Sequence, residues 1–172
     1  FVASLAAIHT LNSACPDVPV SLKWPNDLMA EDRKLGGVLL EADGPHAIVG
    51  CGVNIKNAPR ISDSMWLSTD IAKYQSIIPE PKQLAEAYIN NLKNLFQIWQ
   101  NFGPAPLLAR WQDKSNIIGR HITVGLFDKT VTGICDALEP DGRLNLVDID
   151  GNVHLITAGD VVLMGEVNAS RD

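Results

Sequence analysis

Apolar side chains at the start of the chain recur with the period of an α-helix. Phe1, Leu5, Ile8 and Leu11 share one face, with alanines among the residues between them. This spacing predicts a buried helix over residues 1–14, ended by the two prolines that follow. Because the pattern begins inside a helix, without an initiator methionine, we expect the chain to be a fragment of a longer protein.

Short apolar segments separated by turn-forming residues come next. They predict strands over residues 20–24, 28–30, 35–41 and 47–55. Pro25 ends the first strand, since proline is confined to the ends or edges of strands. The polar turn at residues 31–33 joins the second and third strands into a hairpin, and Asp43-Gly44-Pro45 forms the turn after it.

The middle of the chain carries the clearest helix. Residues 56–80 show weak periodicity and predict a long connection, of the kind that is often functional or mobile. One apolar stripe then predicts a helix that ends before Gly103. The members of that stripe are Leu84, Tyr88, Leu92, Leu95, Phe96 and Trp99. A shorter helix is predicted over residues 105–113.

From Gly119 onward, apolar and polar residues alternate between short turns. The pattern predicts strands over residues 122–124, 131–134, 144–147, 153–155 and 161–163. Strands so short and evenly spaced are typical of a small β-barrel. We therefore predict an α+β fold in two domains, residues 1–115 and residues 116–172.

Composition narrows the functional classes. The 172 residues carry a net charge of −6, which argues against a broad nucleic-acid surface but not against one bound nucleotide. No apolar run approaches the roughly 18–20 residues that span a bilayer. The three cysteines form no CxxC pair and no HExxH is present, so neither a zinc site nor a disulfide framework is indicated. A reducing cytoplasm fits this cysteine usage best.

The first candidate site lies where the first strand ends. Lys23 and Trp24 close that strand, and the proline kink after them presents Asn26 and Asp27 outside the ladder, where their side chains can face a cleft. An ordinary turn is the simpler explanation from composition alone, because Pro-Asn-Asp is rich in turn formers.

The second candidate site lies in the hairpin. Lys34 precedes the pair Gly36-Gly37. Glycines inside a strand usually mark a bulge or the close approach of a ligand, and a lysine beside such an opening can meet a carboxylate or a phosphate. A solvated lysine next to a packing glycine is the more frequent alternative. Residues 50–54, Gly-Cys-Gly-Val-Asn, repeat the arrangement on the next strand, without the spacing of a phosphate-binding loop.

Taken together and in this order, these motifs resemble one family. KWPND at residues 23–27, RKLGGVLLE at residues 33–41 and GCGVNI at residues 50–55 are similar to the core of biotin–protein ligases. The segment from residue 109 to residue 120 also resembles that family's junction to its carboxyl-terminal domain. The resemblance implies the C-terminal part of a class II synthetase-like catalytic domain, with a mixed sheet and helices, followed by an SH3-like β-barrel.

The resemblance also implies a chemistry. The family activates biotin with ATP as biotinyl-5′-adenylate and passes the acyl group to a lysine of a biotin carboxyl carrier protein. By this resemblance, Lys34 contacts the biotin carboxylate and the α-phosphate, and Lys23 is a second catalytic cation near the nucleotide. The remaining implied contacts are Asn26, Asp27 and Asn54 to ATP, with Mg²⁺ carried on the phosphates and Asp27 available to it, and Gly37, Leu39, Gly50 and Gly52 to biotin. A homodimer through the sheet is implied as well.

Alternatives from other classes stay open. A lipoate or octanoate ligase or transferase shares the catalytic fold and the lysine, although the complete KWPND and the added barrel favour biotin. A non-catalytic remnant that binds nucleotide or carrier protein fits the lack of the family's glycine- and arginine-rich loop, which we expect upstream of residue 1. A barrel interaction module leaves the ordered lysines unexplained. We expect neither nucleic acid nor membrane as a partner.

Overall fold

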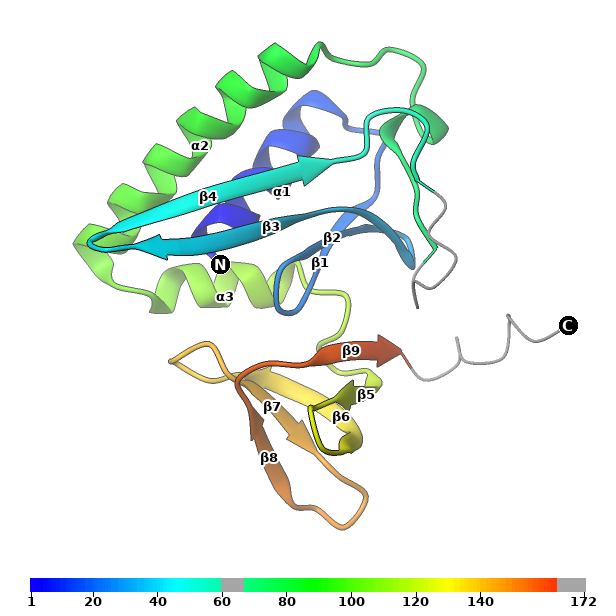
Figure 1. The fold of residues 1–172 in the computed structure, drawn as a ribbon, viewed down its shortest axis with the longest axis vertical. Helices are drawn as coiled ribbons and strands as arrows, with labels where there is room; N and C mark the ends of the chain where they lie inside the picture. Colours follow the sequence, from blue (N-terminus) through cyan, green and yellow to red (C-terminus); the bar gives the residue numbers. More distant parts are fainter. Residues whose placement is uncertain (60–66, 164–172) are drawn as a thin grey trace, which may run out of the picture.

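Two antiparallel sheets, one after the other along the chain, form the framework of the protein (Figure 1). The computed structural model describes residues 1–59 and 67–163. The first sheet has the strand order β1-β2-β3-β4 and carries the helices, and the second has the order β8-β7-β6-β5-β9. This arrangement confirms the predicted α+β fold.

The first sheet contains the four strands that the sequence predicts, with ends that differ by at most two residues. They are β1 (Val20–Lys23), β2 (Asp27–Ala30), β3 (Arg33–Asp43) and β4 (His46–Val53). Neighbouring strands pair antiparallel. Isolated parallel bridges join Leu22 to Ser115 and Lys34 to Ser68, so later parts of the chain return beside both candidate lysines.

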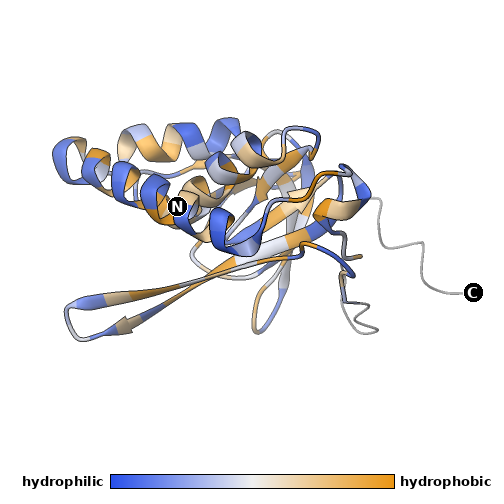
Figure 2. Ribbon diagram, turned by 90° about the horizontal axis from the view of Figure 1, so that it is seen from above, coloured by the Kyte–Doolittle hydropathy of each residue, from blue (hydrophilic) through white to orange (hydrophobic). Residues whose placement is uncertain are grey.

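Three helices lie on one side of the first sheet (Figure 2). They are α1 (Val2–Ala14), α2 (Pro81–Phe102) and α3 (Ala105–Asp113), as predicted. Pro81 opens α2, and Gly103 ends it at a φ of 73°, a left-handed conformation that favours glycine. None of the helices in the described part of the chain is long and apolar enough to cross a membrane.

The hairpin of β3 and β4 extends away from the helices (Figure 2). Leu39, Leu40 and Ile48 on this hairpin are 60%, 54% and 54% exposed, whereas Leu35 near the start of β3 is fully buried. Clustered exposed apolar side chains often mark a binding surface. The projecting half of the hairpin is therefore a candidate surface for a ligand or a partner.

The second sheet comprises all five strands predicted after Gly119. They are β5 (His121–Gly125), β6 (Thr130–Leu138), β7 (Leu144–Val147), β8 (Val153–Ile156) and β9 (Asp160–Leu163). Ile122 and Val124, two residues apart on β5, are both fully buried, as a period of two requires. β9 pairs with β5. Among the described residues no ladder joins β8 to β9, so the structure shows the sheet and not the closure of a barrel.

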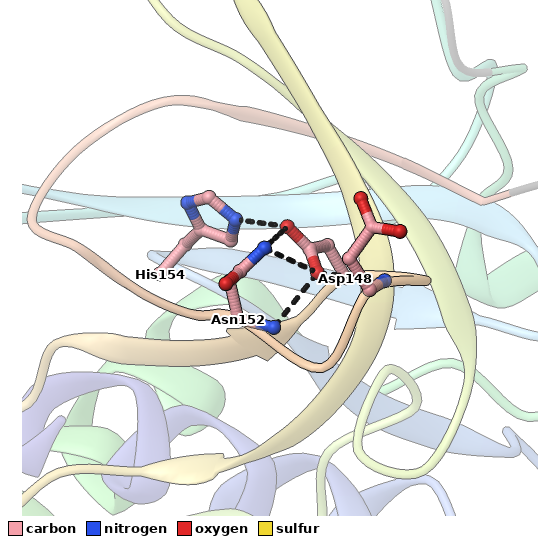
Figure 3. A network of polar contacts seen from close by, with 4 residues as sticks. Asp148, Asn152 and His154 are labelled. Carbon is pink, nitrogen blue, oxygen red and sulfur yellow. Dashed lines mark hydrogen bonds and ion pairs between the residues drawn. The ribbon is translucent and has the colours of Figure 1, made fainter.

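One carboxylate holds the turn between β7 and β8 (Figure 3). Asp148 Oδ1 accepts the backbone N–H groups of Asp150 and Asn152 at 3.0 and 2.8 Å, and Asp148 Oδ2 lies 2.7 Å from His154 Nε2. Hydrogen bonds from the side chains of His154 and Asn152 lower the pKa of Asp148 to about 2. The ionised carboxylate therefore stabilises the folded turn.

Replacing Asp148 by alanine is expected to lower the free energy of unfolding at neutral pH, by an amount that shrinks in acid. The folded-state pKa lies below the ordinary value of 3.8, so the stabilisation is complete above that value and is lost as the pH falls toward about 2. Urea unfolding of the wild type, Asp148→Ala and the control Asp150→Ala at a series of pH values measures this. A wild-type advantage over Asp148→Ala that stayed constant down to pH about 2 would contradict it.

Candidate active site

Asp27 lies between two lysines at the start of β2. Its Oδ2 is 2.8 Å from Lys23 Nζ, and its Oδ1 is 2.5 Å from Lys34 Nζ. One carboxylate thus faces two ammonium groups, and the three side chains together carry one net positive charge. Such a cluster attracts an anion.

The two lysines differ in their exposure. The Lys23 side chain is 5% exposed and that of Asp27 is 10% exposed, whereas the Lys34 side chain is 42% exposed. A buried charge is tolerated only when it is paired, so Lys23 and Asp27 form an internal ion pair. Lys34 presents its charge at the surface, which makes it the cation that an anionic ligand can reach.

Backbone contacts fix these side chains in place. The Asn26 side chain donates from Nδ2 to Val38 O at 2.7 Å, and Val38 N donates back to Asn26 O at 2.9 Å. On the other side, Lys34 N donates to Leu67 O at 2.8 Å and Lys34 O accepts from Thr69 N at 2.9 Å. The backbone next to Asp27 is therefore tied to β3, and the backbone of Lys34 is tied to the segment that follows residue 66.

An open hollow of about 460 Å³ lies beside this cluster, and we call it the β3–β4 hollow. It is lined by Asn26, Asp27, Lys34, Gly37, Val38, Leu39, Gly50, Cys51 and Gly52. Gly37 pairs with Gly52, and Leu39 pairs with Gly50, so these four residues share one face of the hairpin. A cation at one end and a side-chain-poor apolar floor suit a ligand with a carboxylate and a flat apolar body.

The glycines of the hairpin differ in the room around them. A Cβ added to Gly36 would lie 2.2 Å from Gly52 O, whereas a Cβ added to Gly52 would meet nothing within 4 Å. Gly36→Ala is therefore expected to push β3 and β4 apart and to lower the free energy of unfolding by about 1–3 kcal/mol. Gly52→Ala is the matched control and is expected to unfold at nearly the wild-type urea concentration. Equal midpoints for the two variants would contradict the assigned close approach.

Seven of the nine predicted site residues line the hollow, and two do not. Lys23 lies behind Asp27, in the interior. Asn54 instead binds the returning chain: its Nδ2 donates to Thr69 O at 3.0 Å and to Lys34 O at 3.4 Å. A contact between Asn54 and ATP stays a prediction. In this structure the Asn54 side chain links β3 to the segment that returns after residue 66.

The sequence did not predict that the end of the long connection pairs with the backbone of Lys34. Residues 60–66 lie outside the described residues, but Leu67 to Thr69 return beside Lys34, and Thr69 is fully buried. The short helix η1 (Ile71–Lys73) follows. The run Ser-Thr-Asp before it is the available signal, because such residues favour helix starts.

Cys51 also lines the hollow, between Gly50 and Gly52. Burial raises the pKa of the Cys51 thiol above its ordinary value. The protonated thiol is a poor nucleophile, which argues against a catalytic role for this cysteine. Its position between two glycines predicts a small buried filler, but the residue is exposed on the hairpin.

Two protein-family models match separate segments of this chain. Residues 1–54 match the model of the biotin/lipoate A/B protein ligase family, and residues 117–164 match that of the biotin protein ligase C terminal domain. The biotin–acetyl-CoA-carboxylase ligase of Mycobacterium tuberculosis is 33% identical over 150 residues, which covers 87% of this chain and 55% of the relative. The bifunctional ligase/repressor BirA of Escherichia coli is 31% identical over 153 residues, 84% of this chain and 46% of the relative. The chain spans about half the length of these curated relatives.

Solved structures agree in fold. The apo structure of biotin protein ligase from Aquifex aeolicus superposes with a TM-score of 0.83 at 20% identity, covering 94% of this chain and 73% of the other. The same enzyme in complex with biotin and ATP gives a TM-score of 0.80 at 21% identity, covering 94% and 68%.

The sheet, the helices on one side of it and the matched N-terminal residues define the class of the biotin/lipoate ligases. Within that class, the chain belongs to the biotin protein ligase family, because its second sheet is that family's C-terminal domain and its curated relatives are biotin ligases.

Proposed function

We propose that this chain forms part of an ATP-dependent ligase that activates biotin as biotinyl-5′-AMP and transfers it to a lysine of a biotin carboxyl carrier protein. The observation that carries the proposal is the exposed Lys34 ammonium at the end of the β3–β4 hollow, backed by the buried pair of Lys23 and Asp27. The proposed division is a catalytic part, residues 1–115, and a C-terminal domain, residues 116–172, in a cytoplasmic enzyme.

In the first step, a biotin carboxylate oxygen attacks the α-phosphorus of ATP, and pyrophosphate leaves. Lys34 holds the carboxylate and the α-phosphate together, and its charge offsets the negative charge that gathers between them. A preorganised cation of this kind is commonly a large term in such catalysis. Biotin lies along Gly37, Leu39, Gly50 and Gly52, while Asn26 and Asn54 contact the nucleotide.

Lys23 and Asp27 act together in this proposal. Asp27 holds both lysines and so fixes the place of Lys34 before substrate arrives. Because Lys23 neutralises the charge of Asp27, the three side chains together keep the one net positive charge of Lys34. Preorganisation lowers the cost of arranging charge during the reaction.

The donor set does not fit a magnesium ion held by this chain. Both oxygens of Asp27 already face ammonium groups, and the part of the chain that the structure describes contains no group of three His, Cys, Asp or Glu side chains able to hold a metal. Mg²⁺ strongly prefers oxygen ligands in octahedral geometry. The expected contact between Asp27 and Mg²⁺ thus has no structural support, and Mg²⁺ remains a companion of ATP.

In the second step, the ε-amine of a carrier lysine attacks the acyl carbon of biotinyl-5′-AMP. AMP leaves, and the amine loses a proton as the amide forms. The exposed apolar side chains of the β3–β4 hairpin lie next to the hollow and offer a surface for the carrier domain, or for a second copy of the chain in a homodimer.

The acyl substrate and the transfer step are tested together by the mass of the carrier. The natural polypeptide that carries residues 1–172 is incubated with ATP, Mg²⁺, a carrier domain and either biotin or octanoate. We expect the mass increase of one biotinyl group on one lysine. An octanoyl increase instead would make the protein a lipoate-type ligase, and no increase with nucleotide still bound would make it a non-catalytic binding protein.

A further inference from the structure

The segment that carries Lys23 is fastened, on both sides of that lysine, to parts of the chain that follow α3. Before it, Leu22 N donates to Lys114 O at 2.8 Å, and Leu22 O accepts from Asn116 N at 2.9 Å, which ties β1 to the junction between the two sheets. After it, the indole Nε1 of Trp24 donates to Gly142 O at 3.2 Å. Lys23 is thus held between two contacts that lead into the C-terminal part of the chain.

Backbone hydrogen bonds close the turn that supplies Gly142 O. Gly142 N donates to Glu139 O at 2.8 Å, and Glu139 N donates to Arg143 O at 2.8 Å. Gly142 has a φ of +87°, and a Cβ placed on it would lie 2.5 Å from the Phe1 ring. The turn between β6 and β7 therefore fits closely between Trp24 and Phe1, with no room for a side chain.

Trp24 transmits the position of this turn to the cation cluster. Its side chain is 2% exposed, and it lies in sequence between Lys23 and the kink that presents Asp27. A displaced indole would carry the backbone of Lys23 with it, because packed interiors leave little free volume for independent movement. A shift of about 1 Å in a catalytic group is enough to lower a rate severely.

We infer that the β6–β7 turn is a positioning element for catalysis: the Gly142 carbonyl, through the Trp24 indole N–H, sets where Lys23 and Asp27 hold Lys34. Trp24 and Gly142 are positioning residues and touch no substrate. The inference rests on the proposed function for its kinetic consequence, although the coupling itself exists without substrate.

The test uses two matched pairs of variants of the natural polypeptide that carries these residues. Trp24→Phe removes the indole N–H from Gly142 O, and Trp111→Phe removes an equally buried indole hydrogen bond, to Ser4 Oγ at 3.1 Å, which joins α3 to α1. Gly142→Ala adds a Cβ against Phe1. Gly151→Ala adds one at a φ of +83°, with nothing within 4 Å.

Two readouts separate positioning from general stability. In the ligand-free protein, Trp24→Phe and Gly142→Ala are expected to speed amide hydrogen exchange in peptides covering residues 20–30, and the two controls are not. In biotin-dependent ATP–pyrophosphate exchange, the same two variants are expected to lower kcat about tenfold, because Lys34 is held less accurately against the reacting groups, with KM for biotin unchanged.

The outcomes for the inference and for the proposed function are distinct. If Trp24→Phe matches Trp111→Phe, and Gly142→Ala matches Gly151→Ala, in both readouts, the inference is overturned. If the wild type shows no pyrophosphate exchange, the proposed function fails, and hydrogen exchange alone decides whether the turn positions the cluster.

Discussion

Replacing Lys34 by methionine is expected to lower the rate of biotin adenylation about a hundredfold to a thousandfold while the protein stays folded. Lys34 is the exposed cation of the cluster, so its loss removes charge from the reacting groups. The buried pair of Lys23 and Asp27 remains intact in this variant, and stability is expected to change little. Adenylate formation is measured by mass spectrometry with the natural polypeptide that carries residues 1–172.

Lys82→Met is the matched control for this experiment. Lys82 lies on α2 with its side chain 87% exposed, and its Nζ is 4.0 Å from Glu86 Oε1 on the next turn. The substitution is the same, but the charge lies outside the β3–β4 hollow. If Lys34→Met formed adenylate as fast as Lys82→Met, the role assigned to Lys34 would be wrong.

Asp27→Ala is expected to lower the free energy of unfolding by about 3–5 kcal/mol, because it removes the carboxylate that forms an ion pair with the buried Lys23 ammonium. The 5% exposure of the Lys23 side chain gives that charge little access to water. The same variant is expected to lose biotin activation, since Lys34 also loses its holding group. Urea unfolding, followed by tryptophan fluorescence, measures the free energy of unfolding.

Asp32→Ala serves as the control for Asp27→Ala. Asp32 pairs with Arg120 at 3.2 Å, but both side chains are about half exposed, and such pairs contribute about 0–1 kcal/mol. The double variant Lys23→Met/Asp27→Leu removes both charges and is expected to recover much of the lost stability. A single variant Asp27→Ala as stable as Asp32→Ala would show that Lys23 does not depend on its carboxylate.

Local patterns predicted most of the secondary structure because each element has a local cause. The helix over residues 81–102 follows from one apolar stripe between Pro81 and Gly103, and the hairpin of β2 and β3 follows from a polar turn between apolar segments. The alternation in the C-terminal part predicted five strands. Strand order was not predicted, because the pairing of β9 with β5 depends on residues far apart in sequence.

The sequence predicted which residues form the site, but it did not predict the contacts that join these residues to one another and to distant segments. Lys34 beside its glycine pair suggested an anion site, and the family resemblance added Lys23. Nothing local shows that one carboxylate, Asp27, joins the two lysines. The support of Lys34 by Leu67 and the contact of Trp24 with Gly142, 118 residues away, are long-range contacts with no periodic signal. Such contacts require the folded chain.

ATP–pyrophosphate exchange by the natural polypeptide that carries residues 1–172, measured with biotin, with octanoate and with no acid, shows whether this site activates biotin. This assay reports the first chemical step alone and needs no carrier protein. We expect exchange that depends on biotin and is lost in Lys34→Met. Exchange that is equal without acid, or that survives in Lys34→Met, would contradict the assignment of this site to biotin activation.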